Sequence, residues 1–170
     1  MRFGQIRKYD VANGPGIRTS FFVTGCKFNC KGCFNKEYQD FNYGEIWTDE
    51  QTNIIIENLK LDEIEGLTIL GGEPFENCDD LYEIVKKIRK FSDKSIWIYS
   101  GNKFEILLNN KKYKKLLELC DVLVDGLFIE NLKNLKLSFR GSKNQRIIDI
   151  KRSIELNKPV WINKYKDELK

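Results

Sequence analysis

Three cysteines lie within eight residues of this chain, at Cys26, Cys30 and Cys33, in a C-x3-C-x2-C pattern. Side chains this close in sequence can converge on one inorganic centre, and thiolates are preferred ligands of zinc and of iron–sulfur clusters. A structural zinc site takes four ligands, usually as two pairs. A four-iron cluster held by three thiolates leaves one iron without a protein ligand. Because that iron can bind a substrate, the triplet predicts an enzyme.

The chain has five cysteines and no histidine. An odd count with three cysteines crowded together argues against a disulfide framework. The absence of histidine excludes His-dependent proteolytic triads, histidine acid–base catalysis and histidine-containing zinc sites. The chemistry must therefore use cysteine, carboxylate, lysine or a bound cofactor. We expect Cys78 and Cys120 to be buried as small hydrophobic residues. A redox or ligand role for Cys78 is the alternative, because it lies near residues 71–74.

Length and composition predict a single soluble domain over residues 1–170. No apolar run is long enough to span a membrane, and the N-terminus lacks the apolar core of a signal peptide, so we expect a cytoplasmic protein. Residues 1–85 carry 8 basic and 15 acidic side chains, whereas residues 86–170 carry 21 basic and 10 acidic ones. This asymmetry indicates either a docking surface or lysine-rich solvated helices. Nucleic acid binding is not expected, because the lysines have no interleaved aromatic pattern.

Short apolar runs alternate with helical patterns along the chain. Strands are predicted at residues 18–24, 67–70, 95–99, 122–124, 147–150 and 160–162, and helices at 48–60, 79–91, 104–108, 113–119 and 151–156. The first helix begins with a capping box, Thr48 to Gln51. This alternation predicts βαβ units and a mainly parallel sheet. Because a closed eight-unit barrel needs about 250 residues, we predict an α/β fold with an open partial (βα) barrel of about five or six units.

Four polar or glycine-containing segments directly follow predicted strands. The cysteine loop follows Val23, Gly71–Pro74 follows Leu70, Ser100-Gly101 follows Tyr99, and Asp125-Gly126 follows Val124. In sheets of this kind ligands bind beyond the carboxyl ends of the parallel strands. The sequence therefore predicts that these segments form one site.

The cysteine triplet together with Gly71-Gly-Glu-Pro74 resembles the radical S-adenosylmethionine (radical SAM) superfamily. The resemblance implies a [4Fe-4S] cluster bound by Cys26, Cys30 and Cys33, with S-adenosylmethionine (SAM) chelated by the open iron through its amino and carboxylate groups. It also implies reductive cleavage of SAM to a 5′-deoxyadenosyl radical that abstracts a hydrogen atom. The protein then tunes the cluster and excludes water from the radical.

The same resemblance implies cofactor contacts for the Gly-Gly-Glu-Pro segment. Gly71 and Gly72 suit a backbone that approaches a ligand closely, since neither has a Cβ. Glu73 supplies an anionic acceptor for the methionine ammonium group. A plain strand-to-helix turn with an acidic first residue is the alternative interpretation.

Further cofactor contacts are expected from five positions. Gly32, Cys33 and Phe34 are expected to present backbone groups and an aromatic face to the adenine, although related proteins often have tyrosine at the Phe34 position. Ser100 is expected to bond the ribose or to form a simple turn. Asp125 ends an apolar strand, where a carboxylate needs a partner, and it is expected to hold the SAM pocket or a cation.

Two segments narrow the choice within the superfamily. Asn13-Gly-Pro-Gly-Ile-Arg18 and Leu137-Ser-Phe-Arg-Gly-Ser-Lys-Asn-Gln-Arg146 resemble the activating proteins of anaerobic (class III) ribonucleoside-triphosphate reductase. That resemblance implies a protein substrate, the large subunit of the reductase, on which a glycine Cα–H becomes a glycyl radical. It also implies a low-potential electron donor such as flavodoxin or ferredoxin. Arg18 and Arg140 are candidates to steer the glycine-bearing loop, or else form surface salt bridges.

Three alternatives remain open at this point. The Gly-Pro-Gly-x-Arg segment is shared with pyruvate formate-lyase activating enzymes, which are longer. A small-molecule radical SAM enzyme, such as one that makes deazapurine precursors, would need pocket residues that the sequence does not reveal. A non-catalytic zinc-binding or electron-carrier domain would use Cys78 or Cys120 as a fourth ligand.

Overall fold

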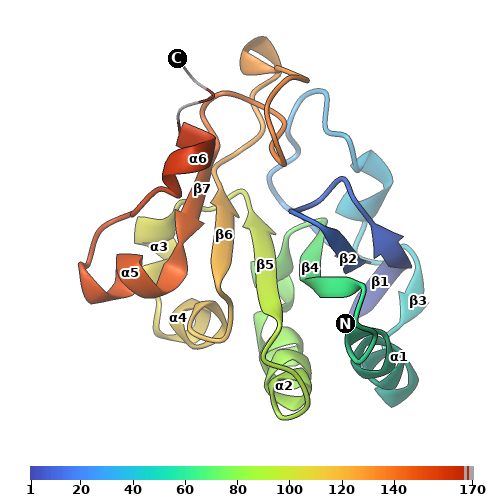
Figure 1. Cartoon of the computed structure of the whole chain (residues 1–170). Helices are drawn as coiled ribbons and strands as arrows, with labels where there is room; N and C mark the ends of the chain where they lie inside the picture. The colour runs from blue at the N-terminus through green and yellow to red at the C-terminus, as the bar shows by residue number, and fades with distance from the viewer. Residues whose placement is uncertain (167, 169–170) are drawn as a thin grey trace.

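The computed structural model describes residues 1–166 and 168, which build a seven-stranded sheet with α1, α2 and α4 on one face (Figure 1). The strand order is β3-β1-β2-β4-β5-β6-β7. The strands are β1 (Arg2–Asp10), β2 (Ile17–Val23), β3 (Glu45–Ile46), β4 (Ile64–Gly71), β5 (Ser95–Ser100), β6 (Val122–Asp125) and β7 (Arg146–Asp149). The α-helices are α1 (Asp49–Leu59), α2 (Cys78–Arg89), α3 (Phe104–Asn109), α4 (Lys111–Leu117), α5 (Ile150–Glu155) and α6 (Asn163–Lys166). Three short 3₁₀ helices are η1 (Lys36–Gln39), η2 (Pro74–Asn77) and η3 (Glu130–Leu132).

The centre of the sheet is parallel and its margins are antiparallel. Strands β2, β4, β5 and β6 pair in parallel. Strand β1 is antiparallel to both β2 and β3, and β7 is antiparallel to β6. The connection between β1 and β2 holds no helix and reverses the chain direction, which gives an antiparallel pair. The sheet is therefore mixed, whereas a mainly parallel sheet was predicted. The open partial (βα) barrel stays a prediction.

Most predicted elements are confirmed, with bounds shifted by a few residues. The strands expected at 18–24, 67–70, 95–99, 122–124 and 147–150 are β2, β4, β5, β6 and β7. The capping box of α1 is present, with Gln51 accepting from the backbone N–H of Thr48 over 2.8 Å. The strand expected at 160–162 was wrong, because Trp161 makes only an isolated bridge to Ile148. Strands β1 and β3 and helix α6 were not predicted.

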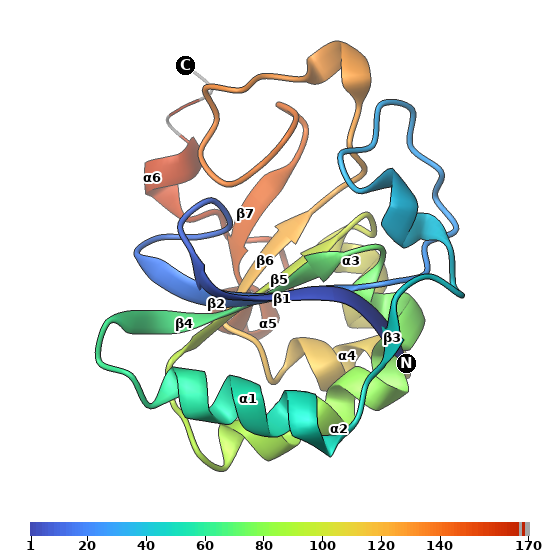
Figure 2. The ribbon, with the colours of Figure 1, turned by 90° about the vertical axis from the view of Figure 1, so that its right-hand side faces the viewer.

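The two faces of the sheet have different coverings. Alternate side chains such as Ile69 and Ile98 join the main hydrophobic core beneath the helices. On the other face Trp97 and Val124 pack with Tyr165 of α6 in a second cluster. Figure 2 shows α1, α2 and α4 on one side of the sheet, and α6 and the longest loops on the other. The loop-covered side is therefore where a ligand can reach the strand ends.

Within the described part of the chain, no helix has the length and apolar character needed to cross a membrane.

Candidate cofactor site

A cavity of about 600 Å³ opens where β2, β4, β5 and β6 end. This volume is in the usual range for small-molecule sites, roughly 300–1,000 Å³. Eight of the ten predicted site residues line it: Cys26, Cys30, Cys33, Phe34, Gly71, Gly72, Glu73 and Ser100. The predicted meeting of the strand ends is confirmed for all four segments, because Gly126 of the Asp125-Gly126 segment also lines the cavity. Gly32 and Asp125 are not among the lining residues.

The cysteine loop is held in place by backbone hydrogen bonds at its start. Gly25 and Cys26 donate to the carbonyls of Tyr38 and Gln39 over 2.8 and 3.0 Å. Farther along, Cys33 N–H donates to the Cys30 carbonyl over 3.2 Å, which curls the loop on itself. All three thiols are free and half-buried, and burial raises the pKa of Cys26 and of Cys30. Three sulfur donors therefore face one cavity.

The donor set fits a cluster better than a single ion. Among the described residues, no group of three or more Cys, Asp or Glu side chains is spaced to hold one metal ion. In a four-iron cluster each thiolate binds a different iron, so the three sulfurs need not meet at one point. Cys78 and Cys120 are buried in the main core and do not line the cavity, as expected of small hydrophobic residues. A four-cysteine zinc site is therefore not assembled here.

The two glycines are needed for close packing of the chain against itself. A Cβ on Gly72 would lie 2.6 Å from the Tyr38 carbonyl and 2.7 Å from the Gly25 carbonyl, both backbone atoms. Gly71 has a φ of +113°, and its Cβ would meet the Val23 carbonyl at 2.5 Å. Glycine was predicted for approach to a ligand. In the structure, the lack of a Cβ at Gly71 and Gly72 allows β4 to pack closely against β2 and the cysteine loop.

Glu73 is the buried acidic residue of the cavity wall. Its Oε1 accepts from Phe75 N–H over 3.0 Å and from Ser100 Oγ over 2.9 Å, and its Oε2 accepts from Gly101 N–H over 2.8 Å. Burial nevertheless raises the pKa of Glu73 to about 7, since desolvation outweighs these three bonds. A cationic group at this carboxylate would favour its ionised form. Ser100 thus contacts Glu73 within the site.

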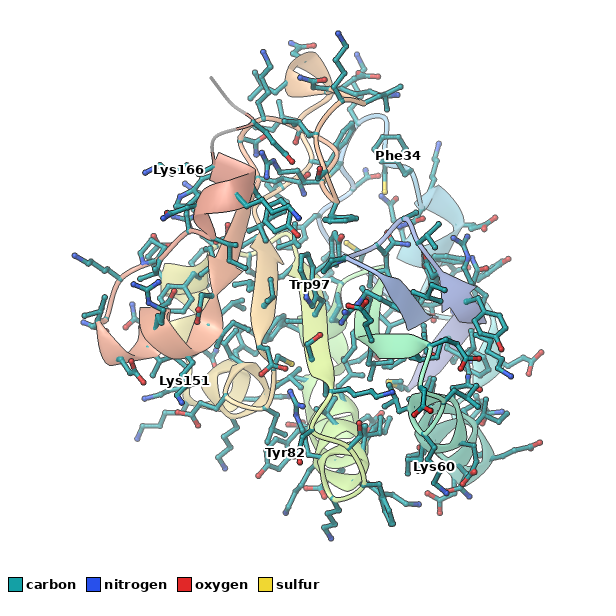
Figure 3. All side chains as sticks on the ribbon, in the orientation of Figure 1. Phe34, Lys60, Tyr82, Trp97, Lys151 and Lys166 are labelled. Atoms are coloured by element: carbon teal, nitrogen blue, oxygen red, sulfur yellow. The ribbon has the colours of Figure 1, made fainter. Side chains whose placement is uncertain are left out.

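Phe34 lies at the mouth of the cavity with more than half of its surface exposed. Its ring packs against Phe128 with the centroids 5.0 Å apart, and the ammonium group of Lys133 lies 4.9 Å from the ring centroid. Figure 3 places Phe34 at the loop end of the molecule, well away from Trp97 on the sheet. Gly32 forms an exposed turn with a φ of +70°, beside Glu130.

Asp125 has a protein partner that the sequence did not reveal. Its carboxylate accepts from Arg146 Nε and Nη2 over 2.8 and 2.5 Å, and from Phe104 N–H at the start of α3 over 2.7 Å. The side chain is fully buried and Arg146 also pairs with Glu105. This ion pair supplies the partner that a buried carboxylate needs, and Asp125 does not line the cavity, so its contact with SAM or a cation stays a prediction.

The two arginines expected to steer a substrate loop are both buried. Arg18 donates to the side chains of Thr68 and Ser95 and to the carbonyls of Leu67 and Ser95. It therefore ties β2 to β4 and β5 on the loop-covered face, and its predicted role at the surface was wrong. Arg140 is buried in the cavity wall, where its Nη2 donates to the Tyr165 carbonyl over 2.7 Å and pairs with Glu168.

Sequence reasoning missed the part of the cavity wall formed by residues 126–145, called the cap loop below. It contributes lining residues that include Leu127, Phe128 and Leu135. The loop has little regular secondary structure, so its sequence has no periodic pattern from which it could be predicted. The Arg-Gly-Ser-x-Asn-Gln segment was the available signal, because its polar side chains bind the backbone of this loop. Asn144 donates to the Leu127 carbonyl over 2.7 Å and Gln145 to the Gly126 carbonyl over 3.0 Å.

Comparison with known proteins gives consistent matches over most of the chain. Residues 12–148 match the family model described as a 4Fe-4S single cluster domain. The anaerobic ribonucleoside-triphosphate reductase-activating protein of Salmonella typhimurium is 37% identical over 150 residues, covering 85% of this chain and 96% of the relative. The proteins of the same name from bacteriophage T4 and Haemophilus influenzae are 35% and 38% identical, covering 86% of this chain and 93% and 97% of themselves.

Proposed function

Because the chain belongs to the family of anaerobic ribonucleoside-triphosphate reductase-activating proteins, we propose that the cavity at the ends of β2, β4, β5 and β6 holds its cofactors. The protein is a radical SAM oxidoreductase with a [4Fe-4S] cluster, and it activates the anaerobic reductase. When bound, the reduced cluster and SAM supply a 5′-deoxyadenosyl radical, which takes a hydrogen atom from a glycine of that reductase.

One observation carries the placement of the cluster. Of the five cysteines, Cys26, Cys30 and Cys33 alone line the cavity, and Gly72 and Glu73 line the same cavity. The three thiolates would hold three irons and leave one iron open toward the Gly-Gly-Glu-Pro segment. The protein offers no fourth cysteine there, which supports a cluster with one open position.

Glu73 is proposed to bind the ammonium group of SAM. Three protein donors fix the carboxylate on the cavity wall, which removes the entropy cost of positioning it when the cofactor binds. A buried carboxylate is stabilised by an opposite charge much more strongly than an exposed one. Phe34 is proposed to cover the adenine side, because its ring lies at the cavity mouth. Ser100 is proposed to act by holding Glu73.

The protein substrate is the anaerobic reductase, and its glycine-bearing large subunit is the proposed docking partner. We also propose a low-potential electron donor such as flavodoxin or ferredoxin, because SAM cleavage consumes one electron. The relatives from Salmonella typhimurium, bacteriophage T4 and Haemophilus influenzae are named anaerobic ribonucleoside-triphosphate reductase-activating proteins, which favours this reductase over pyruvate formate-lyase as the substrate.

Metal analysis tests the proposed site. Protein reconstituted anaerobically with iron and sulfide should contain four irons and four sulfides per chain, and its visible spectrum should change when SAM is added. A chain that instead retains one zinc ion and no sulfide would contradict the proposal and support a binding module.

A further inference from the structure

Six large apolar side chains are exposed on the two loops that border the cavity. We call them the apolar rim: Phe28, Phe34, Leu127, Ile129, Leu132 and Leu135. Leu135 is 81% exposed, more than any other large hydrophobic side chain among the described residues. Isolated exposed apolar residues are ordinary, but a group of them beside a cavity marks an interaction site.

The two halves of the rim lie on loops that contact each other, although they are about a hundred residues apart in the sequence. Phe34 of the cysteine loop packs on Phe128 of the cap loop at 5.0 Å between ring centroids. Lys31 of the cysteine loop pairs with Glu130 of the cap loop over 3.2 Å. Figure 2 shows the cysteine loop and the cap loop on the same side of the sheet, opposite α1 and α2.

The cap loop holds its half of the rim in a fixed position. Ser142 Oγ accepts from Ile129 N–H over 3.2 Å, next to the exposed Ile129 side chain. Gln145 Oε1 accepts from Gly141 N–H and Ser142 N–H over 2.8 and 3.1 Å. Lys143 N–H donates to the Leu132 carbonyl over 2.9 Å. Apolar side chains on an ordered loop lose little entropy on binding, and such residues make effective contacts.

The charge of the cap loop indicates the chemistry of its partner. Lys133, Lys136 and Lys143 are exposed, whereas Glu130 is the one acidic residue of residues 126–145 and is paired with Lys31. A second copy of this chain would bring the same cationic loop against itself, which disfavours self-association through this surface. An apolar segment flanked by acidic residues is complementary to it.

We propose that the apolar rim is the docking surface for the anaerobic reductase, and that it binds an apolar segment flanked by acidic side chains near the radical-site glycine. This inference rests on the proposed function, since it takes the partner from there. Four of the six rim residues also line the cavity: Phe28, Phe34, Leu127 and Leu135. A segment bound on the rim is therefore positioned to place its neighbouring residues inside.

The test uses rim residues that do not line the cavity. Ile129→Asp and Leu132→Asp would be compared with wild type and with Leu156→Asp, a matched control at the end of α5 that is 54% exposed. Anaerobic surface plasmon resonance would measure the affinity for the reductase large subunit. Dithionite-driven SAM cleavage without the reductase would be measured on the same reconstituted proteins.

We expect each rim variant to bind the reductase at least about tenfold more weakly, as for a central interface residue. Leu156→Asp should bind as wild type, and SAM cleavage without the reductase should be unchanged in all variants. Lys136→Glu combined with Lys143→Glu should slow association and reduce its dependence on salt.

Two results would contradict the proposal that the apolar rim is the docking surface for the reductase. One is wild-type affinity for the reductase in both rim variants, and the other is a rim variant that only abolishes self-association of this chain. Failure of the proposed function has a different signature: wild-type protein would bind the reductase, rim variants would not, and SAM would not be cleaved by any of them. That outcome supports the docking surface and contradicts the cofactor site.

Discussion

The hydroxyl group of Ser100 donates a hydrogen bond to Oε1 of Glu73 over 2.9 Å, although the two residues are 27 positions apart in sequence. This bond joins the end of β4 to the end of β5 on the wall of the cavity. Gly101 N–H donates to the other carboxylate oxygen over 2.8 Å, so β5 holds Glu73 from both sides. The two neighbouring strands thus fix the carboxylate before any cofactor binds.

Removing the Glu73 carboxylate should weaken SAM binding and leave the cluster intact. A charge-assisted hydrogen bond contributes roughly 1.5–3 kcal/mol, so Glu73→Ala should bind SAM about ten- to a hundredfold less tightly. Equilibrium dialysis of reconstituted protein with labelled SAM measures the affinity, and the iron content serves as the control. Unchanged affinity would remove Glu73 from the SAM site.

Glu73 should also make the stability of the metal-free protein depend on pH. Its pKa rises from 4.5 in the unfolded chain to about 7 in the folded protein. The folded state therefore binds more protons between these values, and stability falls as the pH rises through this window. Against Glu73→Gln, which does not titrate, wild type should lose up to about 3 kcal/mol of unfolding free energy from pH 4.5 to 7. Urea titrations at several pH values measure the difference, and a constant difference would refute the shift.

Substitution of single cysteines should distinguish those that bind the cluster from those that do not. Cys26→Ala, Cys30→Ala and Cys33→Ala should each fail to retain a full cluster, because each removes the ligand of one iron. Cys78→Ala should retain it, since the Cys78 thiol is buried in the core and does not reach the cavity. Iron and sulfide counts after reconstitution decide the assignment. A full cluster in Cys30→Ala, or its loss in folded Cys78→Ala, would be evidence against these ligands.

Arg18 should matter for stability and not for recognition of the reductase. Arg18→Met leaves buried acceptors of Thr68, Ser95 and Leu67 without their donor, at a cost of about 3 kcal/mol of unfolding free energy. Arg152→Met on α5, an exposed position, should change stability by less than about 0.5 kcal/mol. Urea unfolding gives both values. A stable Arg18→Met protein that no longer binds the reductase would restore a role for Arg18 in docking.

The sequence predicted the site better than its surroundings, for identifiable reasons. Cys26 and Glu73 were expected to share a cavity because the carboxyl ends of neighbouring parallel strands meet at one edge. The burial of Arg18 was missed because a strand pattern does not show which face a loop will cover. The partner of Asp125 was missed because Arg146 comes from an antiparallel strand 21 residues later. Such long-range pairs leave no local periodic signal.

The N-terminal strand and the cap loop were also missed in the sequence, for two different reasons. Strand β1 was not predicted, because Arg7, Lys8 and Tyr9 are exposed in succession and the strand has few apolar positions to alternate. The cap loop carries exposed apolar residues without a period, since most of this segment between β6 and β7 is neither helix nor strand. Its order depends on the side chains of Ser142, Asn144 and Gln145, which contact backbone up to 19 positions away.

The most direct measurement is electron paramagnetic resonance of the reductase after incubation with this protein. Reconstituted and reduced protein, mixed with SAM and the large subunit of anaerobic ribonucleoside-triphosphate reductase, should produce 5′-deoxyadenosine and a glycyl radical doublet on the reductase. The doublet should disappear when the radical-site glycine of the reductase is replaced by alanine, and when Cys30→Ala replaces the wild-type activase. A radical on pyruvate formate-lyase with none on the reductase would contradict the account.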